Sequence, residues 1–538
     1  MDPLSIALIL GLWGFITGVD SYSTKSILGL IPLVAGFVAG LLIGDVVTGA
    51  VVGASTQLIS LGLVPIGGAV PPDFAVVAVV ALLLVKGGVD IGAAVLAAIP
   101  AGILSMYLDI FGRTLNVSII RKADLLVEEG RFDDITKWHF SGLLVLGSMR
   151  FIAYFVSVYI TASFGADALK AFLDALPSWA LGGLSVAGAV LPALGLGILI
   201  SFLNAEKRLL SLLVPFLIVA LIAFDYMFSF VLIGAGIYAW HMLSKVREST
   251  NSGEKGEFRE IPEELAEAMK KIKYRISFFL EPSWNYERMQ ALGYLYSILP
   301  ALKVMYKDEE KLKEAARVHL EFFNTNPFFA PILMGIDIAT EEERPGDWDL
   351  VRAIKTGLMG VFAGLGDSLI YLAIGAVLLI LGSTYTLLAT ESAIFAYIPL
   401  VAIVIFNAIF IPFRLIGLNF GYKRGLRIVE SFKAEKVKGI RSIFEWLAVV
   451  SIGAVLPVVL RVIVAPIYPY LLPIDQSFGI ISLNLLVGSS VGLLLTFFCK
   501  YLRDLGQSPV RILVILFGLG FILGATGILS VVPRGVAT

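Results

Sequence analysis

The sequence predicts an all-α polytopic membrane protein with two structurally related halves, each carrying a broken or re-entrant helical hairpin. Of its 538 residues, 58% are hydrophobic and only 15% are charged, whereas an average soluble protein has about 25% charged residues. Many apolar runs approach the ~20 residues that a helix needs to span a bilayer. They far exceed the ~10 alternating residues of a barrel strand, so helices are expected to cross the membrane.

The apolar runs form two sets separated by a polar stretch. The first set lies at 4–19, 26–44, 74–111 (long enough for two helices), 140–163, 178–202 and 208–240. The second lies at 357–382, 393–412, 443–468, 477–500 and 510–532. Between them, Lys245 to Glu264 contains STNSGEKGE, which is typical of a linker. We divide the chain into a membrane half at 1–245, a linker at 246–262, an amphipathic part at 263–350 and a second membrane half at 351–538.

Lysine and arginine concentrate in two segments next to apolar runs, 113–137 and 423–441. Loops rich in these residues face the cytoplasm, so both segments are expected on the inner side of the cytoplasmic membrane. Ordinary solvated helix faces account for these charges without a ligand. The net charge of −1 gives no reason to expect a nucleic-acid partner.

Two amphipathic helices are expected between the membrane halves. From Pro262 to Pro282, apolar residues recur every three or four positions among charged ones. A second helix should begin after Asp308, a good N-cap residue. It places His319 on its apolar stripe, where a packed, hydrogen-bonded histidine is the plainer interpretation and a ligand contact is the alternative.

The segment 46–73 is apolar enough to lie in the bilayer, but eight glycines and prolines interrupt it. Non-helical backbone at membrane depth is tolerated only beside protein or a wet cavity, so we expect a re-entrant hairpin that lines a site. Asp73 should cap the following helix and can accept a hydrogen bond from a ligand hydroxyl. Gln57 is an amide at membrane depth that needs a partner or a ligand.

A matching break is expected at 357–367, GLMGVFAGLGD, before an apolar helix that starts with Ser368. Paired breaks in two halves indicate a transport site near their interface, which adds Asp367 to the candidates. The alternative is that the glycines allow close helix packing and each aspartate is only a cap.

No catalytic residue, metal or cofactor is predicted. The sequence contains one cysteine, Cys499, and three histidines, His139, His241 and His319. None of the histidines sits in a recognisable phosphate-carrier motif.

Several strings resemble one family, the mannose-family bacterial phosphotransferase system. In the second half, SWNYERMQALGY at 283–294 and HLEFFNTNPF at 319–328 resemble its enzyme IID subunit, as do KTGLMG at 355–360, AGLGD at 363–367 and GYKRG at 421–425. Residues 1–245 are similar to enzyme IIC of the same system, through GLLIGD at 40–45 and IGGAVPPD at 66–73.

This resemblance implies a sugar permease that works by an elevator-like movement, with a fixed and a moving part in each half. It implies a trimer and separate IIA and IIB phosphocarrier proteins, of which IIB phosphorylates the sugar on release. With the residues singled out above, the substrate-binding candidates are Asp73, Gln57, Gly67, Gly68, Trp284, Asn285, Arg288, Gln290, His319, Asn324 and Asp367. Carboxylate and amide groups suit sugar hydroxyls, and Trp284 suits the less polar ring face.

The sequence departs from the glucose and mannose branch at Gln57 and Pro65, where Glu and Asn are expected, and this favours other sugars. No IIA or IIB segment is recognised, so this chain is not expected to run the phosphorelay. The alternative function is a gradient-driven sugar or small-solute transporter in which Asp73 or Asp367 binds a proton or sodium ion. A third is a receptor or scaffold that does not transport.

Overall fold

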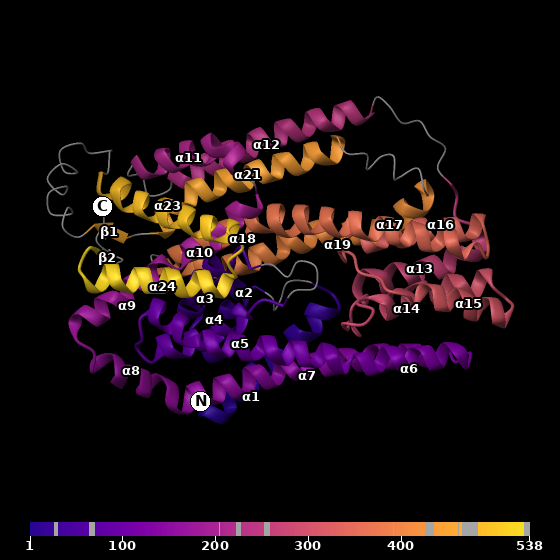
Figure 1. Cartoon of the computed structure of the whole chain (residues 1–538), viewed down its shortest axis with the longest axis horizontal. Coiled ribbons are helices and arrows are strands. Elements are labelled where there is room, and N and C mark those ends of the chain that lie inside the picture. The colour runs from indigo at the N-terminus through magenta and orange to yellow at the C-terminus, as the bar shows by residue number, and fades with distance from the viewer. Residues whose placement is uncertain are drawn as a thin grey trace.

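The computed structural model in Figure 1 is an elongated assembly of helices with one small sheet. It describes residues 1–25, 31–63, 70–203, 205–221, 227–251, 259–390, 392–425, 435–460, 462–464 and 483–531. Within these residues, eight helices are long and apolar enough to cross a membrane. They are Pro3–Tyr22, Ile91–Glu128, Asp134–Gly165, Ser178–Phe202, Trp348–Thr390, Ala393–Arg424, Arg441–Val459 and Leu486–Asp504. The prediction of a helical, polytopic membrane protein is confirmed.

The first half contains twelve α-helices in the described residues. They are α1 (Pro3–Tyr22), α2 (Pro32–Ile43), α3 (Val46–Ser60), α4 (Phe74–Lys86), α5 (Ile91–Leu115), α6 (Val117–Glu128), α7 (Asp134–Ile160), α8 (Ala166–Asp174), α9 (Ser178–Val190), α10 (Pro192–Phe202), α11 (Leu209–Leu221) and α12 (Met227–Asn251). A π-helical turn, η1 (Thr161–Gly165), follows α7, and a short 3₁₀ helix, η2 (Ala205–Arg208), precedes α11. The predicted linker begins within α12, and its residues 252–258 lie outside the described ranges.

The second half begins with α13 (Glu263–Phe278), α14 (Ala291–Met305), α15 (Glu309–His319) and α16 (Ala330–Glu343). Its membrane part comprises α17 (Trp348–Gly366), η3 (Asp367–Gly375), α18 (Ala376–Leu387), η4 (Leu388–Thr390), η5 (Ala393–Tyr397), α19 (Ile398–Arg424), α21 (Glu435–Val459), α23 (Leu483–Asp504) and α24 (Pro509–Ala525). Strands β1 (Val462–Val464) and β2 (Leu529–Val531) pair antiparallel, with Val462 opposite Val531. This small sheet is the one pair of β-strands in the described residues.

The first predicted break is helical over most of its length. Helices α2 and α3 pack against each other at glycines, and a Cβ atom on Gly49 would lie 2.5 Å from the carbonyl oxygen of Gly36. Gly40 and Gly53 also lie in this crossing, so the glycines allow backbones to approach closely rather than break the helix. Residues 64–69, where the chain would have to re-enter, lie outside the described ranges.

The run at 74–111 forms two helices, α4 and α5, as predicted. Every α4 residue from Phe74 to Leu84 is buried. A helix that is apolar on all sides packs in an interior. Helix α4 is therefore an interior helix whose N-terminus points at the region where the two halves meet.

The predicted break at 357–367 is wrong. Helix α17 runs without interruption to Gly366 and continues as the π-helix η3 into α18. Gly357, Gly360 and Gly364 have open space beside them, so nothing forces the chain to turn there. Asp367 consequently lies within a continuous helical rod and does not cap a new helix.

Helices α6 and α13–α16 form a helical cap at one end of the molecule, on the right in Figure 1. Helix α13 buries Leu265, Met269, Ile272 and Ile276 on one face, which confirms the amphipathic prediction. Helix α15 begins after Asp308, whose carboxylate accepts a hydrogen bond of 3.0 Å from the Lys311 amide, also as predicted.

The two basic segments reach the same end of the molecule. Helix α6 belongs to the helical cap, and the Lys423 carbonyl at the end of α19 accepts a 3.1 Å hydrogen bond from the Arg259 amide. Arg259 in turn pairs with Glu342 and Glu343 at the end of α16. This arrangement agrees with a common side for both segments, although residues 426–434 lie outside the described ranges.

Candidate functional site

A cavity of about 320 Å³ lies where the two halves meet. The first half contributes the end of α1, the facing ends of α2–α4, and side chains of α5 and α7. The second half contributes the loops at 281–290 and 324–327, the helical rod of α17, η3 and α18, and α19. Small-molecule sites in proteins have volumes of about 300–1,000 Å³, so the cavity can hold a small solute.

Asp73 forms the first-half wall of the cavity and caps α4, as predicted. Its Oδ1 accepts hydrogen bonds from the amides of Ala75 (3.1 Å) and Val76 (3.4 Å). Its Oδ2 accepts one from the Ser105 hydroxyl (2.8 Å) and lies 2.9 Å from Nη2 of Arg150. The Asp73 charge is thus neutralised by a largely buried arginine from α7, which sequence reasoning did not anticipate.

Gln57 lies beside this wall on α3, with 4% of its surface exposed. Its side-chain oxygen lies 3.5 Å from the backbone nitrogen of Leu33, and its side-chain nitrogen lies 3.4 Å from the hydroxyl oxygen of Ser60. Both distances are long for hydrogen bonds. The Gln57 amide therefore has capacity left for a solute.

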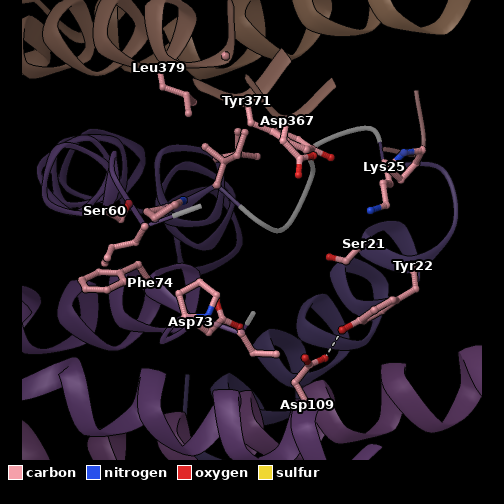
Figure 2. Close-up of a pocket in the computed structure, with 18 of the residues that line it drawn as sticks. Ser21, Tyr22, Lys25, Ser60, Asp73, Phe74, Asp109, Asp367, Tyr371 and Leu379 are labelled. Atoms are coloured by element: carbon pink, nitrogen blue, oxygen red, sulfur yellow. Dashed lines mark hydrogen bonds between the residues drawn. The ribbon is translucent and has the colours of Figure 1, made fainter. Parts of the chain in front are cut away.

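Trp284 lies in a corner of the cavity with Arg113 and Tyr22. The guanidinium of Arg113 lies 4.4 Å from the Trp284 ring centroid, a cation–π distance. Arg113 also pairs with Asp109 at 2.7 Å, and the Tyr22 hydroxyl donates to Asp109 (Figure 2). One face of the Trp284 ring is thus covered by Arg113, so a solute can stack only on the part of the ring that Arg113 does not cover.

Gln290 and Glu281 support the second-half wall. The Gln290 side chain donates to Glu281 (2.8 Å) and to the Thr325 carbonyl (2.9 Å), and it accepts from the Thr325 amide (2.9 Å). Glu281 also pairs with Lys25 of the first half at 2.6 Å. These contacts fix the loop that carries Asn324, a half-buried residue that lines the cavity.

Asp367 lines the cavity from η3 and accepts a 2.8 Å hydrogen bond from the Asn326 side chain. Tyr371, four residues further along η3, lines it too. π-Helical segments occur often at functional sites. Figure 2 shows Asp73, Lys25 and Asp367 on three sides of the cavity.

Three predicted residues, Asn285, Arg288 and His319, do not line the cavity. Asn285 is buried, and its side chain accepts hydrogen bonds from the amides of Glu287 and Arg288, which fixes a turn. Arg288 forms two hydrogen bonds with Asp124 of α6, at 2.7 and 2.9 Å. These residues hold the 281–290 loop in place. The predicted residues Gly67 and Gly68 lie outside the described ranges.

His319 lies inside the helical cap and is completely buried. Its Nε2 lies 3.0 Å from Glu341 and its Nδ1 lies 3.5 Å from Asp337, and the Tyr294 hydroxyl donates to Asp337 at 2.7 Å. Burial raises the pKa of Asp337. The packed, hydrogen-bonded interpretation of His319 is the one that this geometry favours.

Sequence reasoning missed several charged residues of the cavity, namely Lys25, Asp109, Arg113, Arg150 and Glu281. A signal was present, because Asp109 and Arg150 interrupt long apolar helices, where ionisable residues mark functional sites. Arg113 begins the basic segment 113–137, which by itself indicates only membrane topology. Its pairing partners could not be read from local sequence.

The apolar helices, and a cavity between the halves that carries several charged side chains on its wall, define a membrane protein with a candidate site for a small solute. Sequence comparison identifies the family. The family described as "PTS system sorbose-specific iic component" matches residues 4–240, and "PTS system mannose/fructose/sorbose family IID component" matches residues 265–529. The chain belongs to the mannose-family phosphotransferase system, as a fusion of its IIC and IID permease components in the bacterial cytoplasmic membrane.

Individual relatives agree with this assignment. The mannose-specific EIID component of Escherichia coli K12 is 32% identical over 47% of this chain and 91% of its own length. The sorbose-specific EIIC component of Klebsiella pneumoniae is 32% identical over 36% of this chain and 71% of its own length. A solved complex of the mannose transporter ManYZ with microcin E492 includes a chain 29% identical to this one, with 50% of this chain and 99% of that chain covered and a TM-score of 0.28. The family assignment rests on the sequence matches.

Proposed function

We propose that this chain translocates a hexose or a related sugar, which a separate IIB protein phosphorylates as it is released. The observation that carries the proposal is the cavity between the IIC and IID halves, to which both contribute carboxylates and amides. Sugar hydroxyls both donate and accept hydrogen bonds, so a sugar site needs such groups. Gln57 and Asn324, from opposite halves, are the side chains that we propose contact the sugar, together with Asp73 and Asp367.

The transport mechanism is proposed from the family resemblance. The two halves would share one fold, each with a fixed and a moving part, and the sugar site would cross the membrane in an elevator-like movement. A trimer of such chains would form the assembly. The short interior helices α2–α4, which lie against the cavity, are the candidates for the moving part of the IIC half.

The phosphoryl donor in this proposal is a histidine on a IIB partner, which a IIA partner supplies. His139 and His319 of this chain are completely buried, so a phosphocarrier protein cannot reach them. His139 is held by the Ser283 hydroxyl at 2.7 Å and the Phe279 carbonyl at 2.9 Å. Both histidines are therefore suited to structural roles.

Gradient-driven transport is the second candidate, and one observation favours it. Asp367 is a cavity carboxylate that accepts a hydrogen bond from the neutral amide of Asn326. Intramembrane carboxylates commonly bind protons or sodium ions in transporters. Sugar accumulation by this chain in vesicles with an imposed ion gradient and no IIB protein would establish this alternative.

The proposal is tested by direct binding to the purified full chain, with a panel of hexoses, ketoses and amino sugars. Asp73→Asn should weaken binding about ten- to a hundredfold, because a hydrogen bond to a charged group contributes ~1.5–3 kcal/mol. Asp90→Asn is the matched control, since Asp90 caps α5 in the same way but is exposed and outside the cavity.

Asp73→Asn also leaves Arg150 without its carboxylate, and breaking a buried pair costs about 3–5 kcal/mol of stability. Asn324→Ala on the opposite wall therefore serves as a second variant that leaves the ion pair intact. If a panel sugar binds and neither variant changes its affinity, the sugar site lies elsewhere. If no panel sugar binds to the wild-type chain, the proposed substrate class is wrong.

A further inference from the structure

The charged groups that line the cavity pair with one another, with one exception. The described lining residues include three cations and four carboxylates: Lys25, Arg113, Arg150, Asp73, Asp109, Glu281 and Asp367. The undescribed segments 26–30 and 64–69, which adjoin lining residues in the sequence, contain no charged residue. With all seven groups ionised, the lining carries a net charge of −1.

Each of the three cations is already paired with one of the carboxylates. Lys25 lies 2.6 Å from Glu281. The Arg113 guanidinium lies 2.7 Å from Asp109. Arg150 and Asp73 are 2.9 Å apart.

These pairs are also held by other contacts. Arg113 donates to the Tyr22 hydroxyl (3.1 Å) and covers the Trp284 ring. Arg150 donates to the Ser21 hydroxyl (3.0 Å) as well as to Asp73. An anion that recruited one of these guanidinium groups would leave a largely buried carboxylate without its counter-charge, which is costly.

Asp367 is the fourth carboxylate, and none of the three lining cations forms an ion pair with it within 4 Å in the described residues. Its Oδ1 is held by the Asn326 amide, so the carboxylate is fixed at the cavity wall. Like charges repel strongly where water is scarce. Any anion in the cavity would meet the charge of Asp367, with which none of the described lining cations forms an ion pair.

We infer that the cavity selects uncharged solutes and rejects phosphorylated sugars, with Asp367 as a specificity-determining residue. This inference rests on the proposed function and adds a basis for product release. Phosphoryl transfer from a IIB phosphohistidine breaks the P–N bond, forms a P–O bond to a sugar hydroxyl and moves the hydroxyl proton to the imidazole nitrogen that leaves. The product gains a group with a charge of about −1.5 to −2 at pH 7. The same cavity that retains the neutral sugar then expels the ester.

The test compares free sugars with their esters on the purified full chain at pH 7.5, by equilibrium binding. The probes are mannose, fructose, mannose 6-phosphate and fructose 6-phosphate. For whichever free sugar binds, its ester should bind at least about a hundredfold more weakly. Asp367→Asn removes the charge while keeping a polar group beside Asn326, and it should reduce this ratio about tenfold or more.

Asp349→Asn is the matched control. Asp349 lies on α17, the same helical rod, and its side chain is 99% exposed. The variant makes the same change in net charge outside the cavity and should leave the ratio unchanged. Asp109→Asn provides a second route, because it frees Arg113 to meet a phosphate and should raise affinity for the ester.

The outcomes separate this inference from the proposed function. An ester that binds as tightly as its free sugar overturns the inference but leaves the sugar site in place. The inference is also overturned if Asp367→Asn and Asp109→Asn both fold and neither improves ester binding relative to free sugar. Should Asp367→Asn fail to fold, the wild-type ratio and Asp109→Asn still decide the question. Failure of every panel sugar to bind contradicts the proposed function itself.

Discussion

A single glycine shapes the second-half wall of the cavity. Gly366 is the last α-helical residue before η3, and the Asn326 side chain lies directly against it. A Cβ atom on residue 366 would clash with Cβ and Cγ of Asn326. The absence of a side chain at Gly366 is what allows Asn326 to donate to Asp367.

Gly366→Ala should therefore weaken sugar binding about tenfold, because displacing Asn326 loses a hydrogen bond to a charged group. Overpacking of this kind also costs about 1–3 kcal/mol of stability. Gly364→Ala, two residues earlier on α17, is the control, since a side chain there meets nothing within 4 Å. Binding measured by titration calorimetry checks both variants. Equal affinities for Gly366→Ala and Gly364→Ala would show that Asn326 does not shape the site.

At the scale of elements, the α2–α3 pair depends on glycines that face each other across the crossing. Gly49→Ala would place a Cβ atom 2.5 Å from the Gly36 carbonyl oxygen and force the two helices apart. We expect a loss of at least about 1–3 kcal/mol, seen as a lower thermal unfolding midpoint in detergent. Gly236→Ala on α12, where a side chain has open space, should leave the midpoint nearly unchanged. A similar midpoint for both variants would contradict the glycine-packing interpretation.

The helical cap contains a buried cluster whose stability should depend on pH. Asp337 is surrounded by His319, Glu341, Tyr294 and Lys355 from four helices. Burial raises the pKa of Asp337, so the folded state binds its proton more tightly than the unfolded state does. The stabilisation by this group therefore increases as the pH falls through the raised pKa toward the ordinary Asp pKa of 3.8. It is lost as the pH rises above the raised pKa.

Asp337→Asn removes this titration, and the asparagine oxygen can still accept the hydrogen bond from the Tyr294 hydroxyl. We expect the difference in unfolding free energy, wild type minus variant, to grow as pH is lowered from 7 toward 4. Denaturant unfolding of the cap, followed at several pH values, measures it. A difference that stays constant or shrinks would show that Asp337 is not held with a raised pKa.

Local sequence patterns predicted the elements that depend on local physics. Asp73 and Asp308 cap their helices because a side-chain oxygen can reach the first-turn amides within two or three residues. The glycines at 357–366 misled the prediction, since glycine is compatible with a break, with close packing and with a continuous helix. The Asp73–Arg150 pair joins residues 77 positions apart, so only the packed helices reveal it. The ion pairs of the site are, in this sense, a property of tertiary structure.

At the scale of the whole molecule, several side-chain contacts join the second half to the first half near the helical cap. The Asn116 side chain donates to the Trp284 carbonyl at 3.2 Å, and Arg288 pairs with Asp124 of α6. The buried Arg414 guanidinium donates to the carbonyls of Thr24 and Ser277, at 2.7 and 2.8 Å. These contacts join the IIC and IID parts independently of the linker. In the proposed mechanism they would belong to the fixed part.

The orientation of this assembly in the membrane can be tested with single cysteines. Replacing the buried Cys499 with Ala gives a cysteine-free background. Glu129, after α6, and Lys423, at the end of α19, are exposed at the end that carries the basic segments. Because such segments face the cytoplasm, Glu129→Cys and Lys423→Cys should resist an impermeant thiol reagent in whole cells and react in inverted vesicles.

Asp174→Cys should show the opposite labelling. Asp174 ends α8 and is exposed, and α7, whose 27 residues span about 40 Å at 1.5 Å per residue, separates it from Glu129. Figure 1 shows α8 far from α6 along the molecule. Asp174→Cys is thus expected to react in whole cells. Labelling of Glu129→Cys and Lys423→Cys from opposite sides would contradict the fold, whereas inversion of all three sites together would contradict only the assigned orientation.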